Sequence, residues 1–380
     1  MAKRPNIIFR YRYEPRSRLN YRNPIFLVLV FLASFGLIFH LFPTSDDTAI
    51  PNYSDSDDED DNIGDEEGQT SHGEMAGSDG NELVPSGDMM VRSEDSKISY
   101  DILGDPSPNG NGQEPYSSRR LPQCLIIGVR KGGTRALLEF LNLHPTVQKA
   151  SDEVHFFDDD EKYRLGLEWY RSQMPFSLPD QITIEKSPAY FVTDSAPHRI
   201  HAMNSSIKLI LIVRDPVTRL ISDYAQLAEN KARRNDGQKM VSFEQTVLTA
   251  DGSVNIYYKP VRTSIYSIYF TRWAQIFPSQ QIHLVDGDRL VYDPFPEVQR
   301  VEKFLNLAPY IDRDNFVYNS TKGFYCVKFN GTLEKCLNES KGRPHPDVDI
   351  KVIRTLRSFY SPYNHRFYKM TGTDFAWPEI

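Results

Sequence analysis

The stretch from Cys124 to Asn142 constrains the fold of this chain more than any other segment. It begins within LPQCLIIGV, residues 121–129, a short apolar run typical of a central parallel strand. The next segment, RKGGTRALLEFLNLHP, changes to helical spacing, with apolar residues at Ala136, Leu137, Phe140 and Leu141. A strand, a glycine-rich loop and a helix are therefore predicted in direct succession.

Further apolar runs alternate with helical patterns towards the C-terminus. The predicted strands are Ile182 to Lys186, Ile207 to Val213 and Gln281 to Gly287. The predicted helices are Val217 to Ala228, Phe295 to Leu305 and Val348 to Tyr360. Such alternation predicts a three-layer α/β fold with a mostly parallel central sheet. The sequence shows no internal repeat.

The loop GVRKGGT, Gly128 to Thr134, suits an anionic ligand. Its glycines let successive backbone N–H groups converge on one point, and a helix that starts near Thr134 adds the positive end of its dipole. Lys131 contributes a point charge. The spacing differs from the Walker A pattern, so a kinase or NTPase is disfavoured. Taken alone, the loop also fits an ordinary tight turn.

A second polar motif, VRDPVTRLISDYAQ, runs from Val213 to Gln226. A strand ends there and turns through Asp215 and Pro216 into a helix, which puts Arg214 at the carboxyl end of the strand and Ser222 two helical turns on. Open α/β sheets bind ligands at the carboxyl ends of their strands, so this arginine and hydroxyl suit a second phosphate. Alternatively, Arg214 forms a surface ion pair with Asp215 or a neighbouring acid.

The N-terminal 42 residues form a basic tail followed by an apolar run. The first 24 residues hold seven Lys or Arg and one acid, and residues 25–42, IFLVLVFLASFGLIFHLF, contain no Asp, Glu, Lys or Arg. This run is close to the minimum for a membrane-spanning helix. Residues 40–43 offer no small residues for signal cleavage, so an uncleaved anchor is favoured over a signal peptide or a buried core helix. Basic residues ahead of the span predict a type II protein with its C-terminal part in the lumen.

The rest of the chain divides into an acidic stem and a folded domain. Residues 46–114 contain 20 acids and two bases, with little apolar surface to support folding. Residues 116–380 hold 35 bases and 30 acids and are long enough for one large domain, although the whole chain has a net charge of −7. The predicted parts are a cytosolic tail (1–24), a transmembrane anchor (25–42), a flexible stem (43–115) and the domain (116–380).

Cysteines and glycosylation sequons agree with a lumenal domain. Cys326 and Cys336, ten residues apart, can form a disulfide there, which leaves Cys124 as a buried thiol in its strand. The Cys and His spacing of zinc sites does not occur, and no metal is expected. The Asn-x-Ser/Thr sequons are at Asn52, Asn204, Asn319, Asn330 and Asn338.

The two polar motifs, in this order and on successive strand ends, resemble the 5'-phosphosulfate and 3'-phosphate motifs of sulfotransferases that use PAPS (3'-phosphoadenosine 5'-phosphosulfate). Between Leu121 and Trp377, further motifs resemble the heparan sulfate glucosamine 3-O-sulfotransferases. They are EVHFFD (Glu153 to Asp158), WYRSQMP (Trp169 to Pro175), EKSPAYF (Glu185 to Phe191), VDGDRL (Val285 to Leu290), TKGFYC (Thr321 to Cys326) and ESKGRPHP (Glu339 to Pro346). The resemblance implies a P-loop-like sulfotransferase fold and PAPS as co-substrate.

The same resemblance implies roles for individual residues. Those implied to hold the donor are Lys131, Gly132, Gly133, Thr134 and Arg135 at the phosphosulfate, Arg214 and Ser222 at the 3'-phosphate, Tyr325 as an aromatic contact, and Lys341, Gly342, Arg343, Pro344 and His345 closing over the nucleotide. Those implied to face the sugar or its sulfates are Glu153, His155, Asp158, Lys186 and Gln226. Cys326 and Cys336 match the disulfide of the family.

The chemistry of sulfuryl transfer asks for these residue types. A sugar hydroxyl is a poor nucleophile at neutral pH, so a carboxylate must take its proton as it attacks sulfur. Glu153 matches the base of the family, and His155 is the rival base in the same motif. Lys131, the loop N–H groups and the helix end can stabilise negative charge on the departing and sulfuryl oxygens. Lys186 and Arg135 suit sulfates, through charge-assisted hydrogen bonds.

The predicted function is transfer of a sulfuryl group from PAPS to the 3-hydroxyl of glucosamine in heparan sulfate, in the Golgi membrane. The alternatives are a heparan sulfate binding protein that lost catalysis on the same fold, and a sulfotransferase for another glycan position or for tyrosine. Lys131, Glu153, Arg214 and Ser222 favour an enzyme, because a pure binder needs no donor site. The expected partners are acidic heparan sulfate chains and, through the N-terminal helix, the membrane; no nucleic acid partner is expected.

Overall fold

The computed structural model describes residues 116–234, 241–329, 333–337 and 345–379. The predicted anchor (25–42) and stem (43–115) lie outside these ranges. Among the residues in these ranges, no helix combines the length and the apolar character needed to cross a bilayer.

A five-stranded sheet forms the centre of the domain. Its strands lie in the order β3 (Val147–Lys149), β5 (Ile182–Lys186), β2 (Cys124–Gly128), β6 (Lys208–Val213) and β7 (Ile282–Asp286). All neighbouring strands are parallel. After β2 the chain forms β3 and β5 on one side and then crosses over to form β6 and β7 on the other. Sheets of this kind bind ligands at the carboxyl ends of the strands beside such a reversal.

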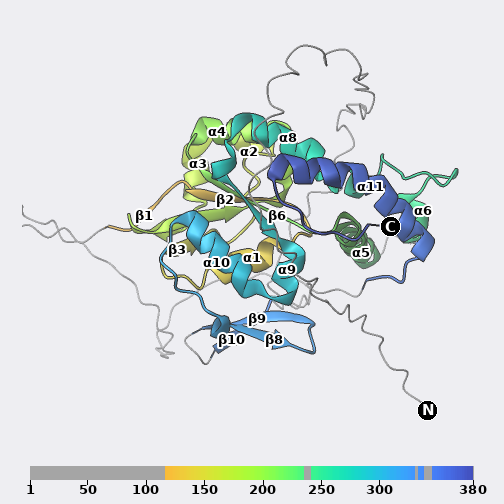
Figure 1. Cartoon of the computed structure of the whole chain (residues 1–380). Helices are drawn as coiled ribbons and strands as arrows, with labels where there is room; N and C mark the ends of the chain where they lie inside the picture. Colours follow the sequence, from red (N-terminus) through yellow and green to blue (C-terminus); the bar gives the residue numbers. More distant parts are fainter. Residues whose placement is uncertain (1–115, 235–240, 330–332, 338–344, 380) are drawn as a thin grey trace, which may run out of the picture. The chain divides into compact units, whose positions relative to one another are not determined.

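Side chains of β2 alternate between two apolar cores, one on each face of the sheet. Helices cover both faces of this sheet (Figure 1). Leu125 and Ile127 belong to the core on one face, and Cys124 and Ile126 to the core on the other. The helices that contribute to the first core include α4 (Ala196–Met203), α8 (Tyr266–Ile276) and α11 (Ile350–Thr371). Those that contribute to the second are α1 (Thr134–Leu141), α9 (Gly287–Tyr292) and α10 (Pro294–Leu305). The predicted three-layer α/β fold with a parallel sheet is confirmed.

Shorter elements complete the domain. The other helices are α2 (Asp160–Arg164), α3 (Gly166–Ser172), η2 (Pro188–Phe191), α5 (Pro216–Arg234), α6 (Phe243–Val247), α7 (Lys259–Thr263), η3 (Ser279–Gln281) and η4 (Arg313–Asn315). The short strands β1 (Ser118–Arg119) and β4 (Phe176–Ser177) form an antiparallel pair. A second small antiparallel sheet has the order β10 (Leu333–Lys335), β9 (Phe324–Phe329), β8 (Phe316–Asn319).

The predicted disulfide is present between Cys326 of β9 and Cys336, just after β10. Cys124 is the free, buried thiol that its apolar strand predicted. Burial raises the pKa of this thiol far above its usual value, so Cys124 has the character of an inert core residue.

Helix α11 is longer than its sequence pattern suggested, and the prediction that it ends at Tyr360 was wrong. Proline usually disfavours a helix interior, yet Pro362 lies inside α11, which continues to Thr371. The second half of the helix buries Phe367, whose ring packs edge-on against Phe270 with centroids 5.5 Å apart. Tertiary packing therefore outweighs the local penalty of the proline.

Candidate active site

The loop after β2 approaches β6 closely enough to require glycine. A Cβ atom on Gly132 would lie 2.6 Å from the carbonyl oxygen of Ile212. Lys131 and Gly133 have φ values of 67° and 111°, and this left-handed backbone turns the chain into α1. Helix α1 begins at Thr134 and has no acidic residue in its first turn, so its positive end is not neutralised from within the helix. The loop thus has the close approach and the left-handed backbone for which its glycines are suited.

One face of α5 binds Arg130 and Lys131, the two cationic residues of this loop. Arg219, Asp223 and Gln226 are spaced by four and three residues, so they share a helix face, and all three are buried. Arg219 donates to the carbonyl of Arg130 at 3.3 Å and to Asp223 at 2.7 Å. Asp223 also accepts from Nε of Arg130 at 2.9 Å. Gln226 was expected to face the sugar; here its Oε1 accepts from Nζ of Lys131 at 2.8 Å.

Asp223 gives a direct test of this arrangement. Because Arg219 is fully buried, loss of the Asp223 charge leaves a cation without its closest compensation. We expect Asp223→Asn to lower the free energy of unfolding by about 3 kcal/mol. Urea unfolding would measure this, with Asp180→Asn, at an exposed acid, as the control. A loss no larger than that of the control would contradict the structural role of Asp223.

Arg214 lies at the carboxyl end of β6, where the sequence placed it. Its Nε donates to Oδ1 of Asp288 at 3.0 Å, and the other carboxylate oxygen of Asp288 accepts from the backbone N–H of Asp215 at 2.6 Å. The ion-pair partner is therefore Asp288, in α9, and not Asp215. Gly287 allows this contact, because a Cβ there would lie 2.7 Å from Cγ of Arg214 and 2.3 Å from the carbonyl oxygen of Gly132. The ends of β2, β6 and β7 meet at this point.

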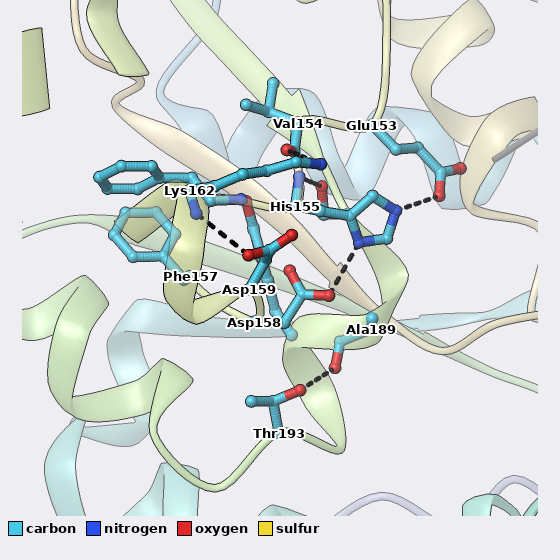
Figure 2. A network of polar contacts seen from close by, with 12 residues as sticks. Glu153, Val154, His155, Phe157, Asp158, Asp159, Lys162, Ala189 and Thr193 are labelled. Atoms are coloured by element: carbon cyan, nitrogen blue, oxygen red, sulfur yellow. Dashed lines mark hydrogen bonds and ion pairs between the residues drawn. The ribbon is translucent and has the colours of Figure 1, made fainter. Parts of the chain in front are cut away.

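The segment between β3 and α2 brings together residues that were expected to face the sugar acceptor, which we call the acceptor-side residues. Figure 2 shows the ring of His155 between two carboxylates, with Nδ1 2.8 Å from Asp158 and Nε2 3.5 Å from Glu153. Glu153 also pairs with Lys186 at the end of β5, whose side chain is only 3% exposed. His155 has a φ of 55°, a strained backbone conformation that is common at functional sites. All four acceptor-side residues that the EVHFFD and EKSPAYF motifs contributed thus lie in one cluster.

The two candidate bases differ in charge. Burial raises the pKa of Glu153, but the hydrogen bond with His155 and the charge of Lys186 outweigh this effect and lower the pKa to about 2. Burial lowers the pKa of His155, but hydrogen bonds with Asp158 and Glu153 raise it to about 9. At neutral pH, Glu153 is therefore an anion and His155 a cation. A protonated imidazole has no lone pair for a further proton, so the geometry favours Glu153 as the base.

His155 also predicts a pH dependence of stability. Its pKa is raised from 6.5 to about 9 on folding, so the folded state holds the proton more tightly. This stabilisation is complete below pH 6.5 and is lost as the pH rises through 9. We expect the free energy of unfolding to fall by up to roughly 3 kcal/mol from about pH 6 to about pH 10, and His155→Gln to lack most of that fall. Urea titrations at both pH values would test this; an equal fall in both proteins would contradict it.

Other predicted donor residues lie around the same strand ends. Nε of Arg135 lies 3.2 Å from Oε1 of Glu139, one helical turn on in α1. Burial lowers the pKa of Lys186, and the positive charge of Arg135 acts in the same direction. Partial desolvation, together with the charges of Arg214 and Lys131, lowers the pKa of His345. His345 therefore lies close to both cations of the proposed donor site, although much of its surface is exposed.

For the remaining predicted residues, the structure gives few contacts that bear on the site. Ser222 is half-buried on α5. The ring of Tyr325 on β9 packs edge-on against Tyr318, with centroids 5.3 Å apart. Lys341, Gly342, Arg343 and Pro344 lie outside the described residues. Among the sequons, Asn204 follows α4 and Asn319 ends β8, whereas Asn52, Asn330 and Asn338 also lie outside.

Sequence reasoning missed four residues that shape the site: Arg130, Asp223, Asp288 and Glu185. Each of them stands within a motif that was quoted for another residue. Their partners are far away in sequence, because Arg130 and Asp223 are 93 residues apart and Arg214 and Asp288 are 74 apart. The available signal was a charged residue within or directly beside an apolar strand or on the buried face of a helix.

Comparison with known proteins agrees with this geometry. Residues 121–374 match the sulfotransferase domain. The chain is 58% identical over 261 residues to heparan sulfate glucosamine 3-O-sulfotransferase 5 of Mus musculus, an alignment that covers 68% of this chain and 75% of the relative. It is 48% identical over 276 residues to heparan sulfate glucosamine 3-O-sulfotransferase 6 of Homo sapiens, covering 72% and 77%. The crystal structure of a sulfotransferase from Alicyclobacillus acidocaldarius, at 17% identity and a TM-score of 0.50, covers 67% of this chain and 97% of its own and shares the fold. The chain therefore belongs to the sulfotransferase family and, within it, to the heparan sulfate glucosamine 3-O-sulfotransferases.

Proposed function

We propose that this chain transfers a sulfuryl group from PAPS to the 3-hydroxyl of a glucosamine residue in heparan sulfate. One observation carries the proposal: the cationic loop that holds Lys131 follows β2, and the anionic Glu153 pairs with Lys186 at the carboxyl end of the neighbouring strand β5. An anion site beside a buried carboxylate is what transfer to a hydroxyl requires, because one half holds the donor and the other takes the proton.

On the donor side, the residues present fit a nucleotide with two anionic groups. The N–H of Gly132 donates to the carbonyl of Val129 at 2.8 Å, so the other loop N–H groups, those of Lys131, Gly133 and Thr134, and the start of α1 suit the phosphosulfate. Arg214 and Ser222 suit the 3'-phosphate. An arginine that is held through Nε still presents its terminal nitrogens for a bidentate contact. The approach of His345 to Lys131 and Arg214 agrees with a C-terminal segment that covers the donor.

On the acceptor side, Glu153 takes the hydroxyl proton while the sugar oxygen forms a bond to sulfur. The bond from sulfur to the 5'-phosphate oxygen breaks, and 3'-phosphoadenosine 5'-phosphate leaves with the electron pair. Lys131 and the loop N–H groups stabilise the charge that grows on the oxygens around sulfur. Lys186 and His155 keep Glu153 ionised and hold its carboxylate in one orientation.

For the cellular setting, we propose a single-pass type II Golgi membrane protein with its catalytic domain in the lumen. The support is the basic tail before residues 25–42 and the oxidised pair Cys326 and Cys336, which suits an oxidising compartment. Protease treatment of sealed microsomes would test this topology. Loss of the domain without detergent would contradict it.

The enzymatic proposal is tested with the purified full-length chain, radiolabelled PAPS and heparan sulfate, followed by disaccharide analysis of the product. The expected product carries sulfate at the 3-hydroxyl of glucosamine. Label at another glycan position would contradict the assigned site of transfer. If no label is transferred, calorimetry with 3'-phosphoadenosine 5'-phosphate separates a heparan sulfate binding protein, which would not bind the nucleotide, from an enzyme for another acceptor.

A further inference from the structure

The end of β5 holds the backbone on which the acceptor-side residues stand. Oε1 of Glu185 accepts from the backbone N–H of Val154 at 3.3 Å. Oγ of Ser187 accepts from the backbone N–H of His155 at 3.0 Å. Two successive amides of the acceptor segment are thus bound by side chains on either side of Lys186, which itself pairs with the side chain of Glu153.

Glu185 is unusual because its carboxyl group is completely buried, with 0% of the residue exposed. A buried carboxyl group needs donors around it, and three are present. Besides the N–H of Val154, Ser187 donates to Oε1 at 2.6 Å and Tyr170 donates to Oε2 at 3.2 Å. Ser187 therefore links Glu185 to the amide of His155. Burial raises the pKa of Glu185 to about 7, against the hydrogen bonds from Ser187 and the Val154 amide, which lower it.

A direct part in the reaction does not fit such a residue. Its carboxyl oxygens are occupied by protein donors and are closed to solvent. Its contacts lead instead to the segment that carries the catalytic carboxylate. A shift of about 1 Å in that segment would move the base away from the attacking hydroxyl, and misplacement on this scale costs about 100-fold in rate.

We propose that Glu185 is a positioning residue for the acceptor half of the site: through Val154 and Ser187, it fixes the backbone that presents Glu153 and His155. The inference rests on the proposed function, because it assigns Glu185 an effect on the rate of sulfuryl transfer. It also predicts a structural effect that can be measured without catalysis.

The test compares two substitutions with a matched control. Glu185→Gln keeps an oxygen acceptor for Val154 and Ser187, whereas Glu185→Leu removes both contacts. The control is Glu302→Leu in α10, because Glu302 is also buried, at 2% exposed, and its Oε1 likewise accepts two hydrogen bonds, here from the backbone amides of Tyr310 and Ile311 at 3.2 and 3.0 Å. All variants are made in the full-length chain.

We expect Glu185→Leu to lower kcat by about 30-fold or more, with the affinity for 3'-phosphoadenosine 5'-phosphate unchanged in calorimetry. Glu185→Gln should stay within about 3-fold of the unaltered chain, and Glu302→Leu should lose stability with a similarly small change in kcat. Hydrogen–deuterium exchange over residues 153–158 should become faster in Glu185→Leu and stay unchanged in Glu302→Leu.

Three results would overturn the proposal: a kcat of Glu185→Leu equal to that of the control, a parallel loss of nucleotide affinity, or equal damage from Gln and Leu at position 185. If the unaltered chain forms no 3-O-sulfated product, the proposed function fails, and the exchange experiment still decides the positioning role. Unchanged exchange over residues 153–158 in Glu185→Leu would then reject it.

Discussion

Glu153→Gln should reduce sulfuryl transfer by about 1,000-fold or more, the largest effect that we expect from any substitution in this chain. The amide is nearly isosteric with the carboxylate but cannot take the proton of the attacking hydroxyl. The change appears in kcat, measured with radiolabelled PAPS and heparan sulfate, because Glu153 belongs to the acceptor side. Calorimetry with 3'-phosphoadenosine 5'-phosphate should show donor binding within about 3-fold of the unaltered chain.

A control variant and the choice of assay temperature keep this result interpretable. Asp152→Asn is the matched control, since Asp152 is the adjacent, exposed carboxylate and should tolerate the change. Glu153→Gln also leaves Lys186 without its counter-charge, so the assay belongs well below the thermal transition of the variant. Turnover within about 10-fold of the unaltered chain would move the base role to another residue, with His155 as the first alternative.

Lys131→Ala should lower kcat by about 100- to 1,000-fold, as expected when one preorganised donor to a developing anionic charge is removed. Nζ of Lys131 is held by Gln226, in a row of α5 residues that fixes the loop, so the charge is in position before the donor binds. The affinity for 3'-phosphoadenosine 5'-phosphate should fall less than kcat, because this product lacks the sulfuryl group. The measurement pairs steady-state transfer with nucleotide calorimetry.

The control for Lys131→Ala is Lys303→Ala, at an exposed lysine near the end of α10, which should leave both quantities unchanged. A loss of nucleotide affinity with kcat unchanged would show that Lys131 contributes ground-state binding and not transition-state stabilisation.

The centre of the fold followed from the sequence because its signals are local. The strand Ile182–Lys186 has the limits that the apolar run predicted, and β2, β6 and β7 lie within one residue of their predicted starts or inside the predicted run. The edge strand β3 was missed because three residues give no readable period. The end of α11 was misjudged because the burial of Phe367, a long-range effect, decides it.

The candidate site was predictable in its residue types and less so in its contacts. Motif spacing pointed to Lys131 and Arg214, the family resemblance pointed to Glu153, and the structure puts each at a strand end or beside one. Their partners could not be read in the same way, because Gln226, Asp288 and Lys186 come from other elements. The protonation state of His155 could not be predicted from the sequence either, which left this residue open as a base. Its position between two carboxylates raises its pKa, so that it is protonated at neutral pH.

The pairing of β2 with β5 has an evolutionary consequence. Leu125 lies opposite Glu185 and Ile126 opposite Lys186. The register of this strand pair therefore sets the distance between the donor loop and the acceptor carboxylate. A slip of one residue would exchange the faces of Glu185 and Lys186 and change the distance that sulfur must travel. A relative with a different acceptor preference would therefore be expected to differ in the surrounding loops and to keep this stretch of sheet.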